Sequence, residues 1–155
     1  MSQLLACFAV AVIVLAPAQD ADHARAAMVM GFDQQATSHH FRLYEDGGAI
    51  EVGVNDPADA KNRDAIRSHL PHIAMMFGNG NFDAPMLVHD STKVPGTAVM
   101  AERHDRIRYT YLETSNGGRV DIVTADPQAL TAVHAFLTYQ IAEHKTGDVT
   151  TVSRR

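Results

Sequence analysis

A Gly-Gly pair followed by an Asp-Pro pair occurs twice in this chain, and this pattern restricts how the chain can fold. Gly47-Gly48 precedes Asp56-Pro57, and Gly117-Gly118 precedes Asp126-Pro127 at the same spacing. Gly and Pro are strong markers of turns and of helix ends. The pattern therefore predicts that one structural unit is present twice.

The residues around each Gly-Gly pair predict two strands. Residues 41–44 and 107–111, which precede the pairs, are rich in aromatic and branched side chains. Residues 50–54 and 120–124, which follow them, alternate apolar with polar or small residues, as half-buried strands do. We expect the Gly-Gly pair to form the hairpin turn.

Each Asp-Pro pair predicts the start of a helix, with Asp as the N-cap and Pro at the first helical position. Apolar residues then recur at helical spacing and predict one buried stripe on each helix. The stripes are Ile66, Leu70, Ile73 and Phe77 in the first helix, and Leu130, His134, Leu137, Ile141 and His144 in the second. Gly78 and Gly147 are suited to end the helices.

Together these patterns predict an α+β fold of two ββα repeats. The repeats would form a four-stranded antiparallel sheet with both helices on one face, in a single domain over residues 31–148. A long connection over residues 78–105 would be functional or partly structured. Residues 149–155 are predicted to be a mobile tail. The uncovered face of such a sheet suggests a homodimer.

The length and charge of the chain limit its function. A chain of 155 residues with 46% hydrophobic residues forms an ordinary folded domain. Its formal net charge of −5 argues against nucleic acid and against an anionic membrane surface as partners, because both attract basic patches. None of the common catalytic sequence motifs occurs, so an enzyme is not the favoured interpretation.

The first 26 residues are typical of an export signal, and they predict a periplasmic or secreted protein. Residues 4–15 are uninterruptedly apolar, and cleavage is expected after Ala18 or Ala26. No Lys or Arg precedes the apolar run, so a short buried helix, or a start of translation at Met28 or Met30, stays an alternative. Cleavage would remove Cys7, the single cysteine, and a metal site would then depend on His, Met, Asp and Glu.

Histidine and methionine in the first helix predict a copper site. His69, His72 and Met76 fall on one helical stripe, and the long connection contributes His89 and Met100. Imidazole and thioether ligands suit copper, and a site with a labile thioether would sequester or transfer the ion. The alternative is that the histidines are solvent-exposed and the methionines fill the core.

His134 supports a second hypothesis, because a histidine on an apolar helical stripe can be an axial haem ligand. The third hypothesis is a structural or interaction module with incidental histidines. His39 and His40 are expected to point to opposite faces of an exposed strand end. His144 is expected to interact with the C-terminal end of the helix dipole.

From Gly31 to Asp148 the chain resembles a group of small, His-rich and mostly uncharacterised bacterial proteins. The resemblance implies no particular activity. It rests on the stretches Gly31-Phe32-Asp33-Gln34, His39-His40-Phe41, Gly47-Gly48, His69-Leu70-Pro71-His72-Ile73, His134-Ala135-Phe136-Leu137 and Glu143-His144-Lys145-Thr146-Gly147-Asp148.

Overall fold

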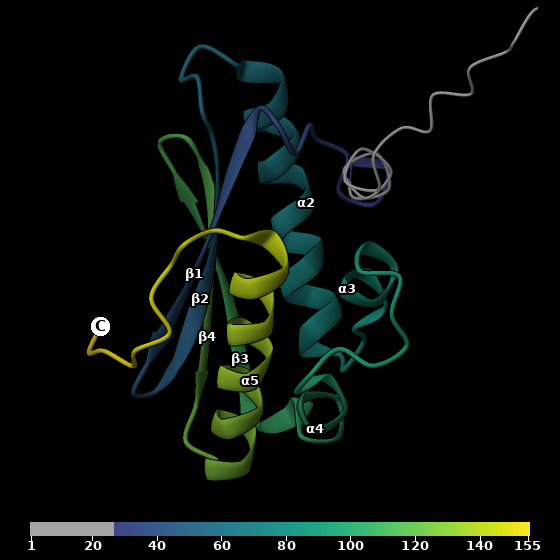
Figure 1. Ribbon diagram of the computed structural model, residues 1–155, viewed down its shortest axis with the longest axis vertical. Helices are drawn as coiled ribbons and strands as arrows, with labels where there is room; N and C mark the ends of the chain where they lie inside the picture. Colours follow the sequence, from purple (N-terminus) through teal and green to yellow (C-terminus); the bar gives the residue numbers. More distant parts are fainter. Residues whose placement is uncertain (1–26) are drawn as a thin grey trace, which may run out of the picture.

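The computed structural model describes residues 27–155 (Figure 1). The predicted signal segment, with its cleavage sites after Ala18 and Ala26, lies outside these residues. Within the described part, no helix has the length and apolar character needed to cross a membrane. In chain order, the elements are β1 (Thr37–Tyr44), β2 (Gly47–Val54), α2 (Ala60–Gly78), α3 (Asp83–Val88), α4 (Thr97–Glu102), the short 3-10 helix η1 (His104–Arg106), β3 (Ile107–Thr114), β4 (Gly117–Thr124) and α5 (Pro127–His144).

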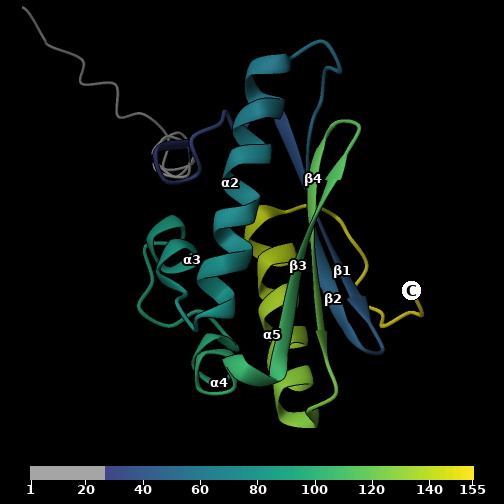
Figure 2. The ribbon, with the colours of Figure 1, turned by 180° about the vertical axis from the view of Figure 1, so that it is seen from behind.

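The strands form one sheet in the order β1-β2-β4-β3, and every neighbouring pair is antiparallel. The helices lie on one face of this sheet, as two opposite views show (Figures 1 and 2). The predicted α+β fold with a four-stranded antiparallel sheet is therefore confirmed. Each hairpin is followed by a long helix, but the interpretation of the two halves as copies of one repeat stays a prediction.

Each long helix packs mainly against the hairpin of the other half of the chain. Helix α2 follows β1 and β2 in the chain but packs mainly against β3 and β4, whereas α5 packs mainly against β1 and β2. Two glycines, one in each central strand, allow the helices to lie close to the sheet. A Cβ atom at Gly48 would overlap the side chain of Leu137 in α5, and one at Gly118 would lie 3.0 Å from Cδ1 of Leu70 in α2.

The Gly-Gly pairs are the first two residues of β2 and β4, so their prediction as hairpin turns is wrong. The turns are formed instead by residues 45–46 and 115–116. The glycines are needed because the two central strands approach closely at these points. A Cβ atom at Gly47 would overlap the carbonyl of Ile122, and one at Gly117 would overlap the carbonyl of Val52.

The predicted N-cap is confirmed for α5 and wrong for α2. Asp126 accepts hydrogen bonds from the backbone N–H groups of Gln128 and Ala129, and Pro127 is the first residue of α5. In the first half, Asp56 and Pro57 belong to a turn, and Asp59 caps α2 three residues later. The local pattern is compatible with both starts because Asp59 is an equally good capping residue.

Residues 149–155, which were predicted to be a mobile tail from their polar composition, contact the sheet. The Ser153 N–H donates to the carbonyl of Leu43, and the Glu45 N–H donates to the carbonyl of Ser153. The Arg155 side chain donates to the carboxylates of Asp46 and Asp121. Backbone pairing along an exposed strand edge does not need apolar side chains, which is why composition did not indicate it.

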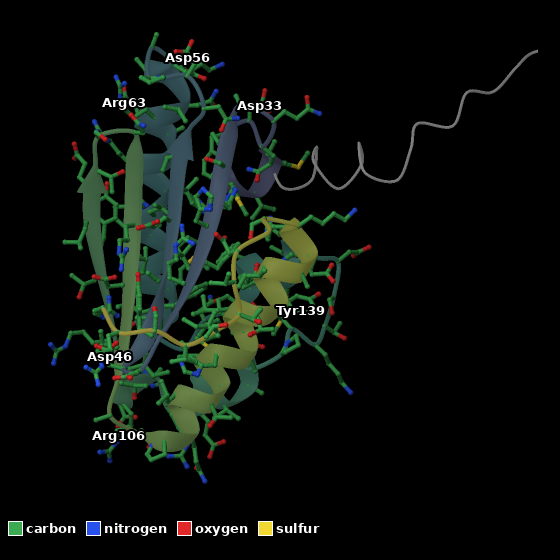
Figure 3. The ribbon with its side chains drawn as sticks, turned by 60° about the vertical axis from the view of Figure 1, so that its left-hand side comes forward. Asp33, Asp46, Asp56, Arg63, Arg106 and Tyr139 are labelled. Carbon is green, nitrogen blue, oxygen red and sulfur yellow. The ribbon has the colours of Figure 1, made fainter. Side chains whose placement is uncertain are left out.

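The face of the sheet opposite the helices carries charged side chains. Arg119 donates to Glu51 at 2.6 Å and to Asp121 at 2.7 Å, and its guanidinium lies over the ring of Tyr44. Asp46 and Arg106 mark one end of the sheet, while Asp33 and Asp56 lie near the other end (Figure 3). A homodimer through this face stays a prediction.

Candidate functional site

A pocket lies between the helical layer and the inner face of β1 and β2. Its empty volume is about 510 Å³, a value that includes the solvent in its open mouth. Side chains from six segments line it: Val29, Met30 and Phe32 before β1, His39 and Phe41 in β1, Ile50 and Val52 in β2, His69, Leu70 and Ile73 in α2, Ala84, Pro85 and Val88 in α3, and Phe136, Gln140 and His144 in α5.

The polar lining consists of three histidines and one glutamine, and the remaining lining residues are apolar. These side chains lie together because α5 crosses the first hairpin, which brings its C-terminal turn over β1. No Lys, Arg, Asp or Glu side chain is among the lining residues. The pocket is therefore an apolar site with a few fixed polar groups, the usual composition of a site for a small organic molecule.

Aromatic rings form a continuous series along the pocket. The His39 ring stacks on His144 with centroids 5.2 Å apart and on Phe32 at 5.9 Å. His69 approaches Phe32 edge-on at 5.8 Å. On the far side of His144, the ring of His89 approaches edge-on at 5.1 Å. Neighbouring rings thus restrain the orientation of His39.

His39 is uncharged at neutral pH. Burial, assisted by the nearby imidazoles of His40 and His69, lowers the pKa of His39 to about 4. Its Nε2 atom is buried and has no hydrogen-bond partner in the described part of the chain. Such a group costs free energy unless a water molecule or a ligand supplies the missing bond.

Gln140 provides a second nitrogen without a partner. Its side chain belongs to a residue that is 4% exposed, and its Oε1 lies 3.0 Å from Nε2 of His89. An amide oxygen only accepts hydrogen bonds, so His89 must donate through Nε2. The Nε2 amide group of Gln140 is buried and has no partner among the described residues.

The residues of the predicted copper site do not lie together: they are found in the pocket, on the surface and in the core. His69 lines the pocket, and burial lowers its pKa. His72 is exposed, with Nδ1 3.0 Å from the carbonyl of Ser68 one turn earlier. Met76 packs against the core, and Met100 is completely buried within it.

His89 is not among the residues that line the pocket, but it contacts two of them, Gln140 and His144. Across residues 27–155, no group of three or more His, Cys, Asp or Glu side chains is placed to hold a metal ion. The copper site stays a prediction that this geometry does not support.

His134, the predicted haem ligand, lies outside the pocket. Its Nε2 is 2.9 Å from the carbonyl of Tyr44 and 3.0 Å from that of Gly47, so Nε2 carries the proton and donates to the hairpin. This nitrogen secures the turn between β1 and β2, which gives His134 a structural role.

The sequence interpretation missed His39, Gln140 and His144 as site residues. The alternation in β1 did contain a signal, because His39 shares the inward-facing parity of Phe41 and Leu43. His40 has the opposite parity and lies 3.1 Å from Asp148. Which residues face His39 depends on the crossing of α5, which no local pattern shows.

Comparisons of the chain with protein-family models, with curated proteins and with solved structures found no match. The function must therefore be inferred from the pocket itself. Its lining residues include no carboxylate pair and no nucleophile beside a base. The arrangement is suited to binding.

Proposed function

We propose that this protein binds a small, mostly apolar molecule in the pocket between α2, α3, α5 and the first hairpin. The observation that carries this proposal is the combination of an apolar pocket with the unpartnered nitrogens of His39 and Gln140. Sites for small molecules typically combine apolar walls with a few convergent polar groups.

Two energetic terms favour an occupied pocket. An apolar ligand gains about 25 cal/mol for each Å² of apolar surface that leaves water. A ligand that also pairs with His39 or Gln140 removes the cost of an unsatisfied buried group, about 1–3 kcal/mol. The apolar walls thus provide affinity, and the two nitrogens provide orientation.

A fluorescent apolar probe, phenylnaphthylamine, tests the proposal. Its emission should rise and shift to the blue when it titrates the protein, because the walls of the pocket are mostly apolar. Ala84→Trp places a large side chain in the pocket wall and should abolish the change. Ala98→Trp, on an exposed position of α4 outside the pocket, is the matched control and should bind like the wild type. Equal binding by both variants would contradict the proposal.

Export and metal binding remain proposals from the sequence and are tested separately. Cu(II) and haemin can each be titrated into the protein. If copper binds at the predicted site, a His69→Ala/His72→Ala variant should lose copper binding. If His134 is a haem ligand, His134→Ala should lose haem binding. A copper site built from histidines should release its ion between about pH 6 and 4, because imidazole binds metals only when neutral. Copper retention at lower pH would exclude histidine as the main ligand.

A further inference from the structure

We infer that the pocket selects neutral ring compounds that carry a hydrogen-bond acceptor, such as aryl ketones, over carboxylates and over plain hydrocarbons. This inference rests on the proposed binding function and specifies its ligand class. It follows from three properties of the pocket. The free polar group of Gln140 is a hydrogen-bond donor, the lining residues include no Lys or Arg, and part of the wall is aromatic.

Gln140 requires an acceptor from the ligand. Its Oε1 lies 3.0 Å from Nε2 of His89 and accepts from it, which leaves the amide nitrogen as the free polar group. The remaining polar group, Nε2, has two N–H donors and no acceptor lone pair. Its partner must therefore be an oxygen or nitrogen with a lone pair, for example a carbonyl oxygen. A plain hydrocarbon would leave this donor buried and unpaired.

The lining of the pocket includes no permanent cation that could neutralise an anion. No Lys or Arg side chain lines it. His39 is uncharged at neutral pH because burial lowers its pKa to about 4, and burial also lowers the pKa of His69. A carboxylate in this apolar surrounding would lose its hydration without gaining a counter-charge, which is strongly unfavourable. A neutral ketone avoids this cost.

Flat rings match the aromatic part of the wall. His39 is near-parallel to Phe41 and to Phe32, with interplanar angles of 19° and 27°. Offset stacking and edge-to-face contacts with such rings stabilise an aromatic ligand beyond the burial of its area. The Nε2 atom of His39 provides an additional hydrogen-bonding position within the same wall.

Three ligands of one shape test the inference: acetonaphthone, ethylnaphthalene and naphthoate, substituted at the same ring position. Their affinities are measured by displacement of bound phenylnaphthylamine at neutral pH. Acetonaphthone should bind about tenfold more tightly than ethylnaphthalene, a ratio within the range expected when one buried donor gains its partner. Naphthoate should bind most weakly. Equal affinities of ketone and hydrocarbon, or tightest binding of naphthoate, would overturn the inference and leave the proposed function intact.

Variants then assign the preference to Gln140. Gln140→Leu should bind acetonaphthone and ethylnaphthalene equally, whereas Gln35→Leu, an exposed control, should keep the tenfold ratio. An unchanged ratio in Gln140→Leu would overturn the assignment. If Gln140→Leu does not fold, Gln140→Met serves the same purpose, and the wild-type ratio remains decisive by itself. Failure of the probe itself to bind would instead reject the proposed function, and the inference with it.

Discussion

The imidazole ring of His39 in β1 stacks on that of His144, the last residue of α5, with ring centroids 5.2 Å apart. The contact joins the edge strand to the end of the helix that covers it. It also encloses an uncharged imidazole between other rings, with its Nε2 buried and without a hydrogen-bond partner among residues 27–155. The stability of the fold and the properties of the pocket therefore both depend on the protonation of His39.

Acidification should destabilise the protein before its carboxylates titrate. The unfolded chain protonates His39 near the reference pKa of about 6.5, whereas burial lowers the pKa in the folded state to about 4. The unfolded state thus binds more protons within this window, and the contribution of His39 falls by about 3 kcal/mol from above pH 6.5 to pH 4. Urea unfolding at a series of pH values measures the decrease.

A matched pair of variants isolates the source of this pH dependence. His39→Leu keeps an apolar side chain in the wall and should flatten the decrease in the free energy of unfolding. His104→Gln changes an exposed histidine and should leave the decrease as it is in the wild type. An equally steep decrease in His39→Leu would show that other groups cause it.

Gly48→Ala should destabilise the fold by about 2 kcal/mol. The added methyl group would overlap both the Leu137 side chain and the backbone carbonyl of Arg42, and overpacking of this kind costs about 1–3 kcal/mol. Gly78→Ala is the control, because its methyl group would meet only Tyr109 at 3.9 Å. Chemical denaturation compares the two. Similar stability of both variants would argue against close packing of α5 on β2.

Asp148→Ala should destabilise the fold by about 1–3 kcal/mol and loosen the edge strand. The carboxylate accepts from the backbone N–H of Phe41 at 3.0 Å and from Arg42 at 2.8 Å. Burial alone would raise the pKa of Asp148, but hydrogen bonds, led by that from Phe41, lower it overall. The loss leaves a backbone donor without its partner.

Hydrogen exchange locates this effect. The Phe41 amide should exchange faster in Asp148→Ala than in the wild type. Asp105→Ala removes an exposed carboxylate whose ion pair with Arg106 is 3.5 Å long, so it should change the stability by less than about 0.5 kcal/mol. Unchanged protection of Phe41 in Asp148→Ala would refute the role of this carboxylate.

Arg155→Ala should lower the midpoint of thermal unfolding, whereas Arg154→Ala should not. Arg155 donates to Asp46 and Asp121 and lies over the ring of Tyr44 at 4.7 Å. Several such contacts together contribute about 1–2 kcal/mol. Arg154 has an 89% exposed side chain, and its ion pair with Glu45 is 3.7 Å long. Equal midpoints of both variants would indicate that the tail contributes no stability.

Much of the fold could be predicted from the sequence because the signals are local. Alternation of period two marks β2 and β4, and spacing of three and four residues marks α2 and α5. The Asp126-Pro127 cap was predicted correctly, since capping involves only the first turn of a helix. The hairpin turns were misplaced because the glycines respond to a neighbouring strand and not to the turn.

The sequence by itself determined the class of the fold and the apolar stripe of α2, since periodicity and capping act over a few residues. In α5 the predicted stripe is wrong, because only Leu137 and Ile141 of its five residues are buried and the buried face is turned toward Val133, Phe136 and Gln140. Only the tertiary structure decided that α5 covers the first hairpin and α2 the second. That crossing brings His39, Gln140 and His144 to one pocket and directs His134 to the turn. Contacts between residues so distant in the chain depend on how whole elements pack, which no local pattern encodes.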